Sequence, residues 1–228
     1  MEEINSAFQF LLDYRNDIIA LVVSTLLLLI YHGYLRNRLR RNPHYTIQAV
    51  NNAARCAWVR HIMENPKDAI LAVQTMRNST MAATFLASTA VLLIMGTLTL
   101  SGQSDKLITS WHQLNLLGSP HPGLWISKVL FLLSDFLVAF FSFSMAVRLF
   151  NHVGYQINVP AELRPAAINP ENVAVHLNRA GRYYSIGMRS YYFSVPLLFW
   201  LFGPHFMVIA TVVLVVVLYH VDRSPKRR

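Results

Sequence analysis

Residues 18–35 read IIALVVSTLLLLIYHGYL, a nearly unbroken apolar run, and four arginines follow it at positions 36, 38, 40 and 41. A helix rises about 1.5 Å per residue, so this run is long enough to cross a hydrocarbon core of roughly 30 Å. The run therefore predicts a membrane-spanning helix, which we expect to begin near residue 6 and to end near residue 35.

Apolar runs recur along the rest of the chain. They predict further helices over 67–100, 124–150 and 170–219, and a more polar helix over 46–64 at the cytoplasmic membrane surface. The fold expected is an all-α polytopic membrane bundle: one membrane domain over 1–228, about four transmembrane helices and long cytoplasmic helical extensions.

Two asparagines that precede prolines mark expected helix starts. Asn65 and Asn169 can each cap a helix whose first position is the proline. Each of these starts follows a basic loop and an apolar helix that ends in a similar motif, YHGY at 31–34 and NHVGY at 151–155. This similarity suggests two parallel hairpin repeats and favours a single pass for the last helix.

The last apolar run is longer than one span requires. Pro196, Gly203 and Pro204 could kink it or fold it into a re-entrant hairpin. The basic C-terminal tail favours a cytoplasmic C-terminus, whereas a single kinked pass places that terminus outside. The sequence leaves both alternatives open.

Composition and charge agree with a membrane protein. Hydrophobic residues make up 54% of the 228 residues and charged residues 14%, against about a quarter charged in soluble domains. Of the Lys and Arg residues, eight lie in 36–80 and five in 148–190, but only one lies in 101–123. The positive-inside rule places the two basic loops in the cytoplasm and the N-terminus outside, as in a bacterial-type inner (plasma) membrane. We expect anionic lipid headgroups as partners and no nucleic acid, because the charges form no continuous basic face.

One polar stripe lies within an expected span. Lys128, Asp135 and Ser142 are seven residues apart and therefore share one helical face. Seven residues are roughly 10 Å of helix, so Lys128 cannot easily pair with Asp135 directly. The stripe either lines a path for an ion or small solute, or joins helices or subunits, with Lys128 extending to the outer surface.

A second set of polar residues is expected on the cytoplasmic side. Asn51, Arg55 and Trp58 share one helical face, which could bind a phosphate group or a partner, or could cap the bundle. Metal ligation has only weak candidates in His112, His121 and His205, because no close-spaced ligand motif occurs. The sequence identifies no cofactor, and the absence of any P-loop or nucleophile motif argues against an enzyme.

Four stretches carry a resemblance to a known family: NNAARCAWV at 51–59, AVQTMRNSTMAAT at 72–84, GMRSYYF at 187–193 and PLLFWLFGP at 196–204. Over nearly its whole length, the chain resembles the domain of unknown function 599 family of membrane proteins. The resemblance implies no activity, but it does imply a shared pattern that includes Arg55, Trp58, Gln74, Arg77, Asn78, Arg189 and Pro204. Asp135 lies outside that pattern.

Three functional hypotheses follow. Four spans make a thin bundle and a midplane Asp135 needs burial, which favours a homo-oligomeric pore or transporter-like assembly for an ion or small solute. The alternative is an accessory or scaffold subunit whose cytoplasmic helices dock a protein partner. A third hypothesis is an enzyme that acts on lipid headgroups at Arg55, Arg77 and Arg189.

Overall fold

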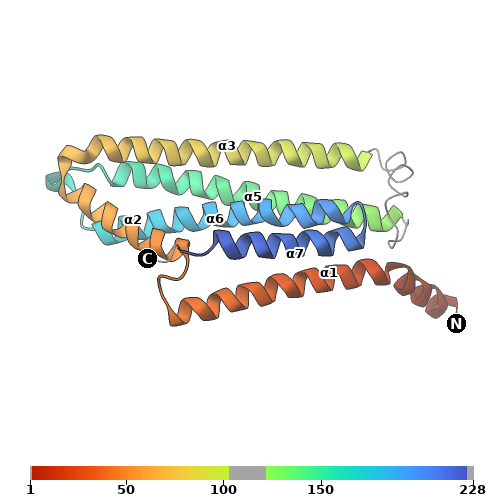
Figure 1. Ribbon diagram of the computed structural model, residues 1–228. Coiled ribbons are helices and arrows are strands. Elements are labelled where there is room, and N and C mark those ends of the chain that lie inside the picture. Colours follow the sequence, from red (N-terminus) through yellow and green to blue (C-terminus); the bar gives the residue numbers. More distant parts are fainter. Residues whose placement is uncertain (1, 103–121, 225–228) are drawn as a thin grey trace. The chain divides into compact units, whose positions relative to one another are not determined.

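The structure is a computed structural model that describes residues 2–102 and 122–224 (Figure 1). Within these residues the chain forms six α-helices and no strand, so the predicted all-α class is confirmed. The helices are α1 (Glu2–Arg41), α2 (Ile47–Glu64), α3 (Ala69–Gly102), α5 (Pro122–Gln156), α6 (Pro170–Trp200) and α7 (Pro204–Val221).

Within 2–102 and 122–224, four segments are long and apolar enough to cross a membrane, which confirms the polytopic prediction. They are Tyr14–Arg41, Ala69–Gly102, Gly123–Gln156 and Pro204–Val221. In α3, only 17% of the residues in its most apolar 18-residue stretch are buried within the protein. Exposed apolar residues of this kind suit a helix surrounded by lipid, where no water penalises them.

The expected single helix over 170–219 is wrong, because the chain breaks it at residues 201–203. The N–H groups of Leu201 and Gly203 donate to the carbonyls of Leu198 and Trp200, closing α6 with tight turns. Gly203 has a φ of 152°, which side-chain-bearing residues rarely adopt, and Pro204 has no N–H with which to continue a helix. The chain therefore reverses here, and α7 runs back beside α1 (Figure 1).

The two Asn-Pro pairs behave differently. Asn169 caps α6 as predicted, since its Oδ1 accepts the N–H of Asn172 at 2.8 Å. The side-chain amide of Asn65 instead donates to the His61 carbonyl at 2.8 Å, which also accepts the Asn65 backbone N–H, so Asn65 caps the end of α2. The helix predicted to begin there starts at Ala69, after a 3₁₀ turn over Pro66–Asp68.

The chain packs into two compact units, which are described separately below. Among the described residues, unit 1 comprises 2–41, 93–102, 122–136 and 191–221, and unit 2 comprises 42–92, 137–190 and 222–224. The helices α3, α5 and α6 each contribute residues to both units.

Unit 1 has two apolar clusters. Tyr31 of α1 packs with Leu214 and Leu218 of α7, which joins these two neighbouring helices. The second cluster combines residues of α5 with the α6–α7 turn: Trp125, Val129, Leu132, Phe136 and Leu201. These contacts tie the hairpin to the rest of unit 1.

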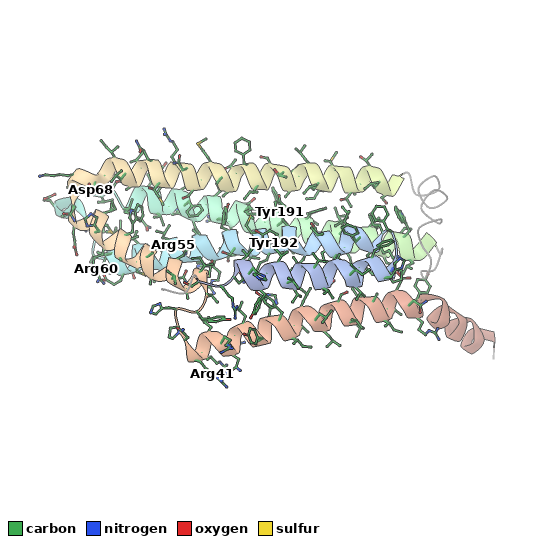
Figure 2. All side chains as sticks on the ribbon, in the orientation of Figure 1. Arg41, Arg55, Arg60, Asp68, Tyr191 and Tyr192 are labelled. Carbon is green, nitrogen blue, oxygen red and sulfur yellow. The ribbon has the colours of Figure 1, made fainter. Side chains whose placement is uncertain are left out.

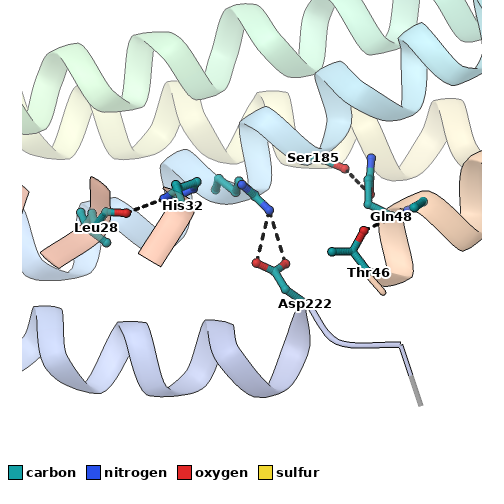
Figure 3. Close-up of polar contacts among 8 residues, drawn as sticks. Leu28, His32, Thr46, Gln48, Ser185 and Asp222 are labelled. Carbon is teal, nitrogen blue, oxygen red and sulfur yellow. Dashed lines mark hydrogen bonds and ion pairs between the residues drawn. The ribbon is translucent and has the colours of Figure 1, made fainter. Parts of the chain in front are cut away.

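Unit 2 is built around closely packed parts of α2, α3, α5 and α6. Small buried residues let the helices approach one another: Ala72 and Ala83 on α3, Ala146 on α5, and Ala180 on α6. Ser224 also belongs to this unit, and its N–H donates to the Tyr45 carbonyl at 3.0 Å. Figure 3 shows Asp222 receiving two contacts, which come from Arg189 at 3.3 and 3.4 Å.

Candidate functional site

Unit 2 contains an open cavity of about 810 Å³, bordered mainly by α2, α3 and α6, which we call the unit 2 cavity. Its polar lining residues are Gln48, Asn51, Arg55, Thr75, Asn78, Ser79 and Ser185. The remaining lining is apolar or aromatic, from Ala54, Trp58, Met76, Ala82, Phe150, Leu177, Gly181 and Tyr184. A mixed lining with a few directed polar groups is typical of sites that bind small molecules.

Arg55 provides the positive charge of this lining. Its Nη1 donates to Asn52 Oδ1 at 3.0 Å and to Asn178 Oδ1 at 3.2 Å, which fixes the guanidinium between α2 and α6. Arg55, which Figure 2 labels, belongs to α2, and Asn178 belongs to α6. The guanidinium also lies against the Gly181 backbone, where an added Cβ would come within 2.5 Å of Arg55 Cζ. Gly181 is therefore the residue that makes room for this side chain.

The charge on Arg55 persists despite partial burial. Desolvation lowers the pKa of Arg55, while the neighbouring Cys56 raises it. Arginine starts from so high a pKa that the guanidinium stays protonated at neutral pH. None of the lining residues is acidic, and the two groups that Arg55 contacts are neutral amides. The cavity can therefore offer a cation to a ligand.

The α6 wall of the cavity is held in place by its own contacts. Ser185 Oγ donates to Gln48 Oε1 at 3.1 Å, as drawn in Figure 3, and to the Gly181 carbonyl at 2.9 Å. The Tyr184 ring packs edge-on against Phe143, with 5.7 Å between ring centroids. These contacts orient the side of α6 that borders the cavity.

The predicted cytoplasmic face is only partly brought together. Asn51, Arg55, Trp58 and Asn78 line the cavity, whereas Arg77 borders a separate hollow on the other side of α3. Gln74 is exposed and is not part of the lining. Arg189 instead pairs with Asp222.

Sequence reasoning missed the part of the site that α6 contributes. Leu177, Gly181 and Tyr184 recur every three to four residues, which marks one helical face, and Ser185 lies beside them. That spacing was a usable signal. It could not reveal that this face lies opposite Arg55, because the contact between Arg55 and Asn178 joins residues 123 positions apart.

The polar stripe on α5 has a partner that the sequence did not suggest. Lys128 Nζ lies 2.8 Å from Asp17 Oδ1 of α1, and the two side chains are 4% and 0% exposed. The same carboxylate oxygen accepts the Trp200 Nε1–H at 2.7 Å, and Lys128 lies 5.3 Å from the Trp200 ring centre. Lys128 thus ends in a buried ion pair within unit 1 and does not extend to the surface.

The other two members of the stripe have different surroundings. Asp135 is half-buried in unit 1, and Ser142 is buried in unit 2. Asp17 escaped notice because it directly precedes the first apolar run, where a carboxylate is expected at the membrane boundary. The buried Lys128 is accounted for by a charge partner on another helix.

The metal candidates gain no support from the described residues. Within them, no group of three or more His, Cys, Asp and Glu side chains could hold a metal ion. The ring of His205 lies 4.2 Å from that of Phe206, centroid to centroid. His112 and His121 lie outside the described residues.

The part of the chain that the structure describes is helical and has four apolar spans, which defines the chain as a polytopic α-helical membrane protein. The chain belongs to the family described as "Protein of unknown function, DUF599", whose profile matches residues 19–227. The resemblance seen in the four sequence stretches is thereby confirmed. Comparisons with curated proteins and with solved structures found no match.

Proposed function

We propose that this chain is a transporter-like membrane protein that binds a small anionic solute in the unit 2 cavity. The observation that carries the proposal is the protonated Arg55 in a cavity whose lining contains no acidic residue. A partly desolvated cation without a compensating charge is stabilised by an anionic ligand. Such a ligand would accept hydrogen bonds from the guanidinium.

The rest of the lining supports the binding of a small molecule. Asn51 and Asn78 can donate to further oxygen atoms of an anion, and they come from two different helices. Trp58 and Phe150 supply apolar surface that can contact a short carbon skeleton. A carboxylate or phosphate attached to a small organic group matches this combination.

The proposal extends to where the protein works. The cavity is bordered by α2, which lies within the first basic segment, 36–80, and the positive-inside rule assigns that side to the cytoplasm of a bacterial-type inner membrane. The α3 segment that borders the cavity continues into an apolar span ending at Gly102. A binding site at the end of a membrane-spanning helix suits a protein that transfers a bound solute across the membrane. A homo-oligomer would combine the thin bundles of several subunits, and together they could enclose a pathway for the solute.

The test is anion binding and flux with the purified chain in lipid nanodiscs and proteoliposomes. Inorganic phosphate, acetate and glycerol phosphate are titrated by calorimetry, and counterflow of the tightest binder is then measured. We expect Arg55→Gln to weaken binding at least tenfold, the size of one lost charge-assisted hydrogen bond. The matched control is Arg60→Gln, also on α2, whose exposed side chain pairs with Glu171 at 3.3 Å. Equal binding by wild type and Arg55→Gln would overturn the proposal.

An accessory or scaffold subunit is the second candidate, and exposed apolar residues favour it. Near the basic loops, Ile70 and Leu71 at the start of α3 are 70% and 56% exposed, and Val175 on α6 is 63% exposed. Exposed apolar side chains of this kind mark contact surfaces for proteins or lipids. The test is native mass spectrometry of the gently extracted chain. A fixed complex with a second membrane protein that Leu71→Ser loosens would support this role, and a homo-oligomer alone would contradict it.

A further inference from the structure

Two smaller hollows of unit 2 lie along one face of α3 and α5, away from the polar lining of the cavity. The first, about 320 Å³, is bordered by Arg77 and Thr80 of α3 and by Asn151 and Tyr155 of α5. The second, about 250 Å³, is bordered by Thr84 and Val91 of α3 and by Phe140 and Val147 of α5. Figure 1 shows the two helices side by side.

Helical spacing indicates that the hollows are successive parts of one groove, which we call the α3/α5 groove. On α3, the lining positions 77, 80, 84, 87 and 91 advance by three or four residues. On α5, the lining positions 140, 144, 147, 151 and 154 advance in the same way. Positions at this spacing form one helix face. From Arg77 to Val91 the groove runs for about 21 Å at the usual helical rise.

One end of the groove is cationic and polar. Arg77 is exposed and has no ion pair or hydrogen bond with another described residue, so its charge is available. Asn151 is also exposed, and the Tyr155 side chain beside it is 81% exposed. The three side chains come from two helices and can together surround an anionic group.

The other end of the groove is uncharged and mostly apolar, although the small hydroxyl residues Ser88 and Ser144 also border it. Phe140, Val91 and Val147 border it, and the Thr84 hydroxyl is already used, since it donates to the Thr80 carbonyl at 2.9 Å. Small residues keep the groove open. In the first hollow, the atom nearest to a Cβ at Gly154 would be Met76 Cβ, at 3.9 Å, so the space beside this glycine is open.

We propose that the α3/α5 groove is a binding site for an anionic phospholipid. The phosphate would sit at Arg77, Asn151 and Tyr155, and an acyl chain would lie along the groove toward Val91. Both helices are membrane spans, so their outer faces contact lipid. A groove of about 21 Å matches the depth of one leaflet, which is half of a bilayer about 40–45 Å thick including headgroups. The positive charge at its polar end selects an anionic headgroup over a zwitterionic one.

This site is separate from the unit 2 cavity. Only Met76 and Phe150 border both the cavity and the first hollow, and both are buried, so they form the wall between them. The polar groups of the two sites, Arg55 and Arg77, do not overlap. Loss of one site therefore leaves the other intact, and the two proposals can fail independently.

The experiment is native mass spectrometry of the full chain in detergent with phosphatidylglycerol and phosphatidylethanolamine of identical acyl chains. We expect wild type to retain phosphatidylglycerol selectively and Arg77→Gln to lower that retention about tenfold, as the loss of a charge-assisted contact predicts. Arg36→Gln, at the exposed basic end of α1, is the matched control and should retain the lipid. Equal retention by wild type and Arg77→Gln would overturn the headgroup site.

A second variant tests the groove itself without changing charge. Ser88 is exposed and borders the second hollow, so Ser88→Phe fills the space while leaving Arg77 in place. We expect this variant to lose the long-chain lipid and to keep wild-type affinity for phosphate at the unit 2 cavity. Undiminished retention of phosphatidylglycerol by Ser88→Phe would overturn the acyl-chain seat.

Discussion

The guanidinium of Arg55 occupies the space that Gly181 leaves free. An added Cβ at position 181 would come within 2.5 Å of Arg55 Cζ, although the two residues belong to different helices. The Arg55 guanidinium can therefore lie at this position only because residue 181 of α6 is a glycine and has no Cβ. A substitution of Gly181 can therefore displace the Arg55 charge without removing it.

Gly181→Ala should displace Arg55 and weaken anion binding in the unit 2 cavity about tenfold, because the guanidinium no longer points at the ligand. Calorimetric titration with phosphate in nanodiscs measures the change, and circular dichroism checks that helix content is retained. The control is Gly33→Ala, since a Cβ at Gly33 would meet nothing within 4 Å. Full affinity in Gly181→Ala would show that this position of Arg55 is not the binding position.

Lys128→Met should destabilise the protein by about 3–5 kcal/mol, because it leaves the Asp17 carboxylate buried without its cation. The double variant Asp17→Leu with Lys128→Met should recover most of this loss, since no unpaired charge remains. Unfolding by SDS in mixed micelles gives the four free energies of a double-mutant cycle. Simple addition of the two single effects would rule out coupling between Asp17 and Lys128.

Gly187→Ala should lower stability by about 1–3 kcal/mol through overpacking. A Cβ there would lie 2.7 Å from Cζ of the fully buried Phe143, which has no space to withdraw. Phe143→Leu in the same chain should restore part of the stability, because leucine lacks the ring atoms that the new Cβ would meet. Gly96→Ala, with nothing within 4 Å of the new Cβ, provides the neutral comparison in the same unfolding assay.

Cysteines at positions 44 and 224 should be labelled from the same side of the membrane. The Ser224 N–H donates to the Tyr45 carbonyl at 3.0 Å, so Ser224 lies beside the loop after α1. On a Cys56→Ser background, His44→Cys and Ser224→Cys should both react with an impermeant maleimide only after the cells are opened. Labelling of Ser224→Cys alone in intact cells would contradict the α6–α7 hairpin.

Hydropathy and capping predicted most of the fold because these features are local. The apolar run at 18–35 lies in α1, and Asn169 caps α6 through a hydrogen bond three residues away. The reversal at residues 201–203 was predicted only as one of two alternatives, and the structure shows that Pro196 is accommodated inside α6 while Gly203 ends the run. Both residues can kink or break a helix, and the sequence does not say which will occur.

Only those residues of the site that share one helix face could be predicted from the sequence. Asn51, Arg55 and Trp58 share a face of α2, and that face does border the cavity. The ion pair between Asp17 and Lys128 depends on which helices pack together, and that information is tertiary. For the same reason, the sequence singled out Lys128 and missed its partner.

The reversal at Gly203 also bears on how the chain is inserted during synthesis. Among the described helices, α7 qualifies as a membrane span by its apolarity, whereas α6, which carries Arg179, Arg182 and Arg189, does not. Only three residues separate the two helices, so α7 can draw α6 into the bilayer as a paired hairpin. We therefore expect a nascent chain that ends at Trp200 to leave α6 outside the hydrocarbon, and insertion of α6 to wait until α7 has left the ribosome.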